Sequence, residues 1–172
     1  PLAGALDWSR PGIDRATKFV AQLHEEPADA ADYTPRFFTP YEWRTVRVLS
    51  DIVIPKDERS GSATDAKAPE FIDFMLMDKE TSEGSKVSMR GGLAWLDEEM
   101  RKRFGTDFLS SSDANRRALP DDLAYPQKVN RGRKRGSRGF DRLRSHVGAA
   151  LVFRAMRWQD LRYLANVFHP NR

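Results

Sequence analysis

The sequence of 172 residues contains no cysteine. This absence excludes disulfide bonds, thiolate metal sites, cysteine nucleophiles and the covalent attachment of c-type haem. No apolar run approaches the ~20 residues that a helix needs to cross a bilayer, so no part of the chain is expected to span a membrane. Apolar residues make up 40% of the chain. That share is enough for the core of one domain of ordinary size.

The usual catalytic signatures are also missing. The sequence has no GxGxxG, GxxxxGK[ST], GxSxG or HExxH motif. A flavin or nicotinamide site normally needs a glycine-rich turn between a strand and a helix, so no cofactor is expected in this chain. The histidines His24, His146 and His169 are far apart and lack a ligand spacing, which favours surface or capping positions over a metal site. No catalytic, cofactor-binding or metal-binding residue is assigned.

One segment carries most of the positive charge. Residues 128–144 contain eight lysines and arginines and one acid, a net charge of +7, whereas the whole chain has +4 and the remainder therefore has −3. Three readings stay open for this segment: a solvated loop, a docking surface for an acidic partner, or a site for nucleic acid or anionic lipid. It lacks the interleaved aromatic residues of a single-strand binder.

Apolar residues recur at helical spacing through most of the chain. The sequence Thr39-Pro40-Tyr41-Glu42 predicts a capped helix start, and Ile54-Pro55 predicts the end of that helix. Further helices are predicted over 14–25, from Pro69 to Leu76, over 86–104 with Gly105 as its cap, over 110–119 with a stop at Pro120, and from Phe140 onward. No stretch alternates as a strand would. The predicted fold is all-α: a small irregular helical domain with long loops and extended N- and C-terminal arms.

The positions of the prolines and of the apolar residues divide the chain into three predicted regions. Residues 1–36 are predicted to be an extended partner-binding arm, residues 37–168 the helical domain and residues 169–172 a tail. The arm is too short to bury its own apolar face, so burial on another chain would have to offset the entropy lost when it becomes ordered. Aromatic anchors and arginines are typical of such interfaces. The candidate partner contacts are Trp8, Phe19, Phe38, Trp43, Arg131, Arg133, Arg135, Tyr163 and Asn166.

Four motifs, in order, resemble one known family. Residues 37–55, FFTPYEWRTVRVLSDIVIP, are similar to the opening of the gluconate 2-dehydrogenase subunit 3 family. The family's next segment, an acidic polar loop followed by a Phe-Ile-Asp helix, resembles residues 57–76. Its Arg-Gly-Leu-x-Trp-Leu-Asp motif resembles residues 90–97 with one extra glycine. Its closing pattern resembles residues 160–166, where Ala165 stands in place of the usual glycine.

The resemblance implies a function. It implies a non-catalytic small subunit of an exported dehydrogenase complex that oxidises a sugar, glycoside or sugar acid. The partner would be a large flavoprotein of the glucose-methanol-choline oxidoreductase type, with FAD bound there, and a multihaem cytochrome c could take the electrons. The small subunit would stabilise the flavoprotein and carry it to the periplasm by twin-arginine export, although the sequence begins at Pro1 and shows no signal segment. The alternatives are a nucleic-acid-binding module that uses residues 128–144 and a cofactor-free enzyme.

Overall fold

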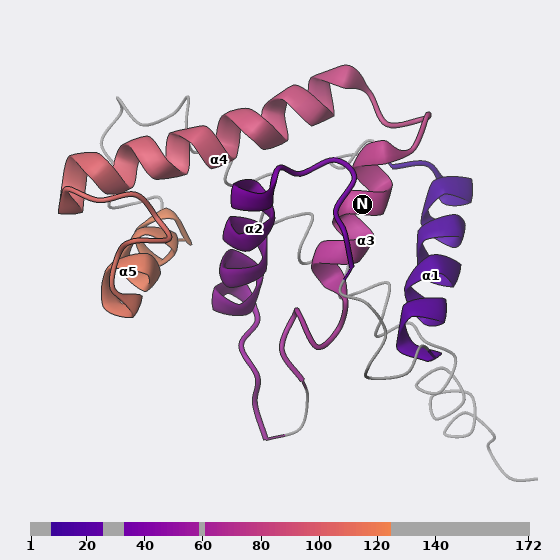
Figure 1. Ribbon diagram of the computed structural model, residues 1–172, viewed down its shortest axis with the longest axis horizontal. Coiled ribbons are helices and arrows are strands. Elements are labelled where there is room, and N and C mark those ends of the chain that lie inside the picture. The colour runs from indigo at the N-terminus through magenta and orange to yellow at the C-terminus, as the bar shows by residue number, and fades with distance from the viewer. Residues whose placement is uncertain (1–7, 26–32, 59–60, 125–172) are drawn as a thin grey trace, which may run out of the picture.

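The computed structural model describes residues 8–25, 33–58 and 61–124 (Figure 1). These residues form α-helices and no strand, so the all-α prediction is confirmed for them. None of the described helices is both long enough and apolar enough to span a bilayer. The helices are α1 (Arg10–Glu25), α2 (Pro40–Val53), α3 (Ala68–Met77), α4 (Glu83–Phe104) and α5 (Asp113–Ala124).

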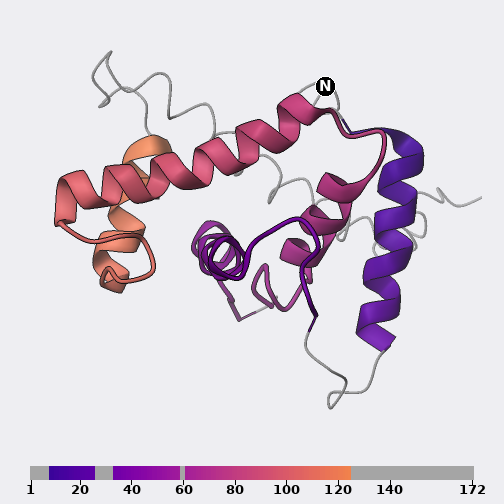
Figure 2. The ribbon, with the colours of Figure 1, turned by 45° about the horizontal axis from the view of Figure 1, so that its top comes forward.

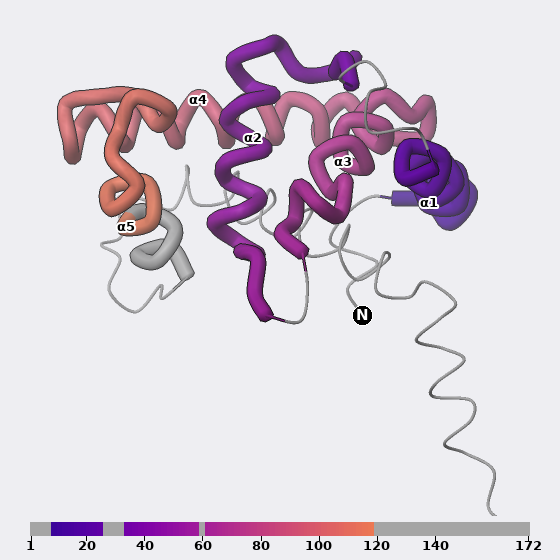
Figure 3. Tube along the Cα trace, turned by 60° about the horizontal axis from the view of Figure 1, so that its bottom comes forward, coloured from indigo at the N-terminus to yellow at the C-terminus, as the bar shows by residue number. Residues whose placement is uncertain are grey.

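The longest helix, α4, runs across the ends of the others (Figures 1 and 2). Helix α3 packs between α1 and α2, and α2 also contacts α5. The view in Figure 3 shows the same order, with α5, α2, α3 and α1 following one another along α4. Helix α3 is therefore central, and eight of its residues are buried.

The core is made of the apolar stripes that the helical spacing predicted. In α4, Met89, Leu93, Leu96 and Met100 are all buried. These side chains lie on one side of the helix because they are three or four positions apart. The largest side chains with less than 2% exposure are Phe108, Leu49, Ile72, Met75, Leu76, Met89, Leu96, Met100 and Val46.

The predicted ends of α2 are confirmed. The Thr39 hydroxyl accepts a hydrogen bond from the Glu42 amide at 3.3 Å, and the Glu42 carboxylate accepts one from the Thr39 amide at 2.8 Å. The helix ends at Val53, just before Ile54-Pro55. Gly105 caps α4 as predicted, with a φ of 77° that glycine adopts without steric cost.

Several helix boundaries differ from the predictions. Helix α1 begins at Arg10, because Pro11 falls in the first turn, where a missing amide donor costs nothing. Helix α4 begins at Glu83, because the Ser82 hydroxyl accepts from the Ser85 amide at 3.2 Å and caps it. The predicted stop at Pro120 was wrong: α5 continues to Ala124, although the proline cannot donate a backbone hydrogen bond.

The described part of residues 1–36 includes a helix that packs on the body of this chain. Along α1, Gly12, Ala16 and Val20 recur at every fourth position and are buried. A methyl group added at Gly12 would lie 3.2 Å from the Met75 methyl carbon, so the small residue permits close packing against α3. Residues 10–25 of the region are thus helical and lie against this chain. The proposed domain boundaries stay predictions, and residues 125–172 lie outside the described residues.

Candidate partner-binding surface

A fully buried carboxylate holds the segment that leads into α2. Asp73, on α3, is 0% exposed. Its oxygens accept hydrogen bonds from the Tyr33 hydroxyl at 2.7 Å and from the backbone amides of Arg36, Phe37 and Phe38 at 2.9, 3.0 and 3.2 Å. These four donors offset the cost of burying the charge. The bonds fix residues 33–38, which have no regular secondary structure, against α3.

Two other acids act in the same way. Asp97 accepts from the Tyr41 hydroxyl at 2.9 Å and from the Phe108 amide at 3.0 Å, which joins α2 and the segment after α4. Asp51 accepts from the amide and the hydroxyl of Thr64, at 2.8 and 2.7 Å. Asp51, Asp73 and Asp97 each lie in one of the motifs of the resemblance. Each is bonded to another segment of the chain, so the geometry favours a structural role for all three.

The two tyrosines bonded to these acids are held in the phenol form. Burial, followed by the hydrogen bond to Asp73, raises the pKa of Tyr33 well above its ordinary value. Burial and the hydrogen bond to Asp97 raise the pKa of Tyr41 in the same direction. Both hydroxyls are therefore donors at any physiological pH, and neither is poised to remove a proton from a substrate.

A row of aromatic rings connects three helices. Phe74 stacks on Phe19 with ring centroids 4.9 Å apart, and Phe19 lies 5.9 Å from Tyr33. The row continues from Tyr33 to Trp43 at 5.4 Å and from Trp43 to Phe38 at 6.3 Å. Such tilted and offset pairs add to the stability that area burial provides. Because the rings come from α3, α1, the 33–38 segment and α2, the row holds these elements in fixed relation.

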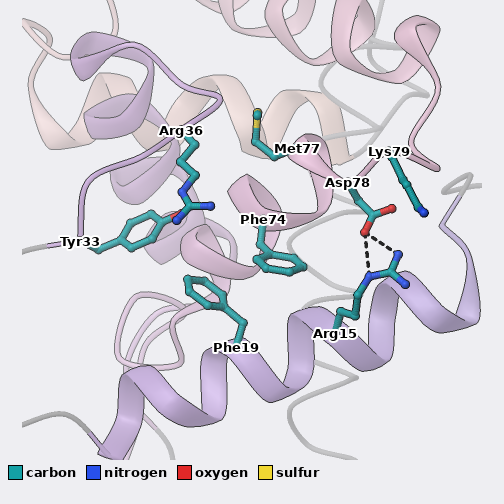
Figure 4. Close-up of a pocket in the computed structure, with 8 residues that line it drawn as sticks. All are labelled: Arg15, Phe19, Tyr33, Arg36, Phe74, Met77, Asp78 and Lys79. Carbon is teal, nitrogen blue, oxygen red and sulfur yellow. Dashed lines mark hydrogen bonds and ion pairs between the residues drawn. The ribbon is translucent and has the colours of Figure 1, made fainter.

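The first of two hollows beside this row has a volume of about 350 Å³. Its polar side is dominated by cations: Arg15 is hydrogen-bonded to Asp78 at 2.7 Å, and Arg36 and Lys79 are exposed (Figure 4). Burial alone would raise the pKa of Asp78, but the hydrogen bonds from Arg15 and from the Glu80 amide outweigh it and lower that pKa. The lining residues are Arg15, Phe19, Tyr33, Arg36, Phe74, Met77, Asp78 and Lys79.

The second hollow has a volume of about 560 Å³ and shares Tyr33 with the first. Arg44 and Arg47, both exposed, are three positions apart on α2 and therefore border it from one side of that helix. The Arg47 guanidinium lies 5.9 Å from the centre of the Trp43 ring. Among the described residues, no carboxylate lines this hollow, whose lining is Tyr33, Trp43, Arg44, Arg47, Val48 and Leu109.

A third hollow, of about 200 Å³, is lined by two carboxylates, and both already accept hydrogen bonds from this chain. Of its two acids, Asp97 bonds to Tyr41 and Phe108, and Glu42 accepts from the Thr39 amide. Within the residues the structure describes, no group of three His, Cys, Asp or Glu side chains could hold a metal ion.

The predicted partner contacts fall into three groups. Trp8, Phe38 and Trp43 are 8%, 4% and 7% exposed and belong to the core of this chain, so they have little surface left for a partner. Phe19 is half-buried and lines the first hollow, while Trp43 also lines the second. The others lie outside the described residues, as does the basic segment 128–144: Arg131, Arg133, Arg135, Tyr163 and Asn166.

Sequence reasoning missed the basic residues that border the hollows. Arg44 and Arg47 follow the capping box directly and alternate with the apolar positions of α2. Two arginines three positions apart on the polar side of a predicted helix form a pattern that could have indicated a charged surface there. Arg36 could not have been found in this way, because Asp73 determines the path of its segment.

Comparison with known proteins gives one match. Residues 40–157 match the family described as gluconate 2-dehydrogenase subunit 3, and the matched region is more than half of the chain. Neither the curated proteins nor the solved structures gave a match.

Proposed function

The chain belongs to the gluconate 2-dehydrogenase subunit 3 family, and on that premise we propose that it is a non-catalytic small subunit that stabilises the flavoprotein subunit of a dehydrogenase complex. Membership indicates an accessory subunit of a sugar dehydrogenase complex that has other subunits.

One observation carries the non-catalytic part of the proposal. Asp51, Asp73 and Asp97, one acid from each of three of the motifs, each accept at least two hydrogen bonds from other segments of the chain. In an enzyme, such acids would be candidates for a general base. In this chain they support the backbone, which is what a subunit that presents a surface requires.

The proposal extends to the partner and to the compartment. The partner is a large FAD-containing flavoprotein of the glucose-methanol-choline type, which oxidises a hydroxyl group of a sugar, glycoside or sugar acid. A multihaem cytochrome c is a possible third component that would accept the electrons. The complex is periplasmic and leaves the cytoplasm by twin-arginine export of the folded subunits. Support for these points comes from the family and from the missing cofactor signature in this sequence.

Co-expression tests the proposal. The flavoprotein is produced with and without this chain, and the soluble yield, the flavin absorbance and the sugar-dependent reduction of a dye are measured. We expect more soluble, flavin-loaded enzyme when the chain is present, and a stable complex of the two on gel filtration. The isolated chain should show neither flavin absorbance nor dye reduction. Dye reduction by the isolated chain would contradict the proposal, as would a flavoprotein that is equally stable alone.

No observation favours the nucleic-acid alternative. The segment on which it depended, residues 128–144, lies outside the described residues. The same preparation tests it, because a phosphate-binding module would retard an oligonucleotide with a steep dependence on salt.

A further inference from the structure

Two arginines on the outer side of α2 lie beside a hollow and are not neutralised by a nearby carboxylate of the described residues. Some cations of the described helices do pair with an acid: Arg15 pairs with Asp78, and Lys102 pairs with Glu98 at 2.6 Å. Arg44 and Arg47 form no ion pair within the described residues, and both border a hollow with an apolar wall. Positive side chains beside a concave apolar surface are a combination suited to binding an acidic, partly apolar ligand.

We infer that the face of α2 around the second hollow docks an acidic segment of the catalytic partner subunit that carries a large apolar side chain. In this arrangement, carboxylates of the segment pair with Arg44 and Arg47. The apolar side chain enters the hollow between Trp43, Val48 and Leu109. This inference rests on the proposed function, since it assigns the surface by which the subunit holds its partner.

Charge complementarity identifies the occupant. The two hollows are bordered by Arg15, Arg36, Arg44, Arg47 and Lys79, and Asp78 is the one acid among their described lining residues. Asp78 is already bonded to Arg15, so Arg36, Arg44, Arg47 and Lys79 form no ion pair within the described residues. Arginine binds carboxylates through two parallel N–H···O bonds, which gives direction as well as attraction. The basic segment 128–144 of the same chain has the wrong sign to fill this role.

The shape of the hollow favours a peptide over a nucleic acid. Single-stranded nucleic acids bind to exposed aromatic faces on which bases can stack. The Trp43 ring is only 7% exposed, and Arg47 lies over it at 5.9 Å, so little of its face is open. The other aromatic residue of the lining, Tyr33, is bonded to Asp73 and packed against Trp43, and the rest of the apolar wall is aliphatic, from Val48 and Leu109. This lining favours an aliphatic or aromatic side chain of a peptide over a row of stacked bases.

The site is also preformed. Tyr33, which lines both hollows, is bonded to the buried Asp73 at 2.7 Å, and Trp43 is packed against Tyr33 and Phe38. Side chains that are already fixed lose little conformational freedom when a partner binds, and such preorganisation increases affinity. The one adjustment needed is in the exposed arginines, which can rotate toward the incoming carboxylates.

The first test uses a model ligand and the full-length chain. A fluorescein-labelled octapeptide that alternates glutamate with leucine is titrated by fluorescence anisotropy. The lysine–leucine peptide, the glutamate–serine peptide and a labelled single-stranded oligonucleotide serve as comparison ligands. We expect the glutamate–leucine peptide to bind most tightly and its affinity to fall as salt is raised. The double variant Arg44→Glu/Arg47→Glu should weaken it by roughly tenfold or more.

A matched variant separates local from general charge effects. Lys18→Glu/Arg101→Glu changes the net charge by the same amount at exposed positions of α1 and α4 that line neither hollow. It should leave peptide binding within about twofold of wild type. The neutral variant Arg44→Gln/Arg47→Gln should give an intermediate loss, and circular dichroism melting shows whether each variant is folded. Equal losses in the two charge-reversal variants, or tighter binding of the oligonucleotide or the lysine peptide, would overturn the inference.

The second test is made in the complex and separates the inference from the proposed function. If the wild-type chain forms a complex with the flavoprotein and Arg44→Glu/Arg47→Glu weakens that complex at least as much as it weakens peptide binding, the inference is supported. If the complex forms equally well with wild type and with the double variant, the docking surface is wrong although the proposed function stands. If the wild-type chain forms no complex and does not stabilise the flavoprotein, the proposed function fails, whatever the peptide shows.

Discussion

The inner and outer sides of α2 are built from different interactions. On the inner side, Val46, Leu49 and Ser50 are 0% exposed, and the chain leading into the helix is held by the buried Asp73. On the outer side, Arg44 and Arg47 are exposed and lie beside a hollow. The inner side shows what the fold requires of this helix. The outer arginines form no ion pair within the described residues, although Arg47 lies over the Trp43 ring, and we therefore assign their charges to a partner.

The largest loss of stability on the inner side of α2 is expected from the substitution Asp73→Ala. The substitution leaves the buried amides of Phe37 and Phe38 without their acceptor, and each unsatisfied buried donor costs about 1–3 kcal/mol. We therefore expect the free energy of unfolding to fall by roughly 3–6 kcal/mol once the Tyr33 hydroxyl is included. Urea denaturation measures it. Asp14→Ala, at an exposed position of α1, is the control and should change stability by less than about 0.5 kcal/mol.

A smaller loss is expected at the start of the helix. Thr39→Ala removes the hydroxyl that accepts from the Glu42 amide, and loss of such a cap costs about 1 kcal/mol. Thr39→Ser keeps the hydroxyl and should behave as wild type. Thermal unfolding compares the three proteins. An alanine variant as stable as wild type would show that the capping box contributes nothing measurable here.

A substitution of Glu70, on α3, is expected to raise the stability of the chain instead of lowering it. This side chain is 3% exposed, one of its carboxylate oxygens has no described hydrogen-bond partner, and burial raises its pKa. A raised pKa in the folded state means that Glu70 favours folding below its unfolded pKa and that this contribution is lost as the pH rises through the folded pKa. At pH 7, Glu70→Gln should therefore stabilise the chain by up to about 1 kcal/mol.

The pH dependence provides the check on Glu70. Unfolding measured from acid to neutral pH should show wild type losing stability relative to Glu70→Gln as the pH rises. The matched variant Glu25→Gln, at an exposed position, should run parallel to wild type. If the difference between wild type and Glu70→Gln does not vary with pH, the carboxylate is not held in the environment that the structure describes.

The smallest change in stability is expected on the outer side of α2. Arg44→Glu alone should change the free energy of unfolding by less than about 0.5 kcal/mol, since the exposed side chain forms no described ion pair. Chemical denaturation of this variant beside Asp73→Ala measures the contrast directly. A loss above 1 kcal/mol would mean that Arg44 serves the fold, and the distinction between the two sides of α2 would fail.

Much of the fold could be predicted because its signals are local. The capping box, the Ile54-Pro55 stop and the cap at Gly105 depend on residues within a few positions of one another. Pro11 was misleading because a proline in a first helical turn resembles a break in the sequence. The packing of α1 on α3 was not predicted, since it depends on where Gly12 meets Met75, and the two are far apart in sequence.

The candidate surface was less predictable for the same reason. The bonds of Asp73 to Phe37 and Phe38 join residues 36 and 35 positions apart, and no spacing rule indicates such a pairing. Phe19 and Trp43 were proposed as partner contacts and do line the hollows, but the structure also buries most of Trp43. Arg44 and Arg47 were overlooked because the denser charge of residues 128–144 dominates the sequence.

Hydrogen bonds to the Asp73 carboxylate hold an irregular segment of the chain in a fixed conformation. Residues 36–38 belong to no helix, yet their amide protons are all bonded to a side chain that water does not reach. Buried amides of this kind exchange with solvent deuterium only when the surrounding structure opens. The amides of Phe37 and Phe38 should therefore exchange as slowly as those in the middle of α3. A loop that exchanges this slowly also keeps the neighbouring Tyr33, which lines both hollows, in place between encounters, so a partner meets the same surface each time.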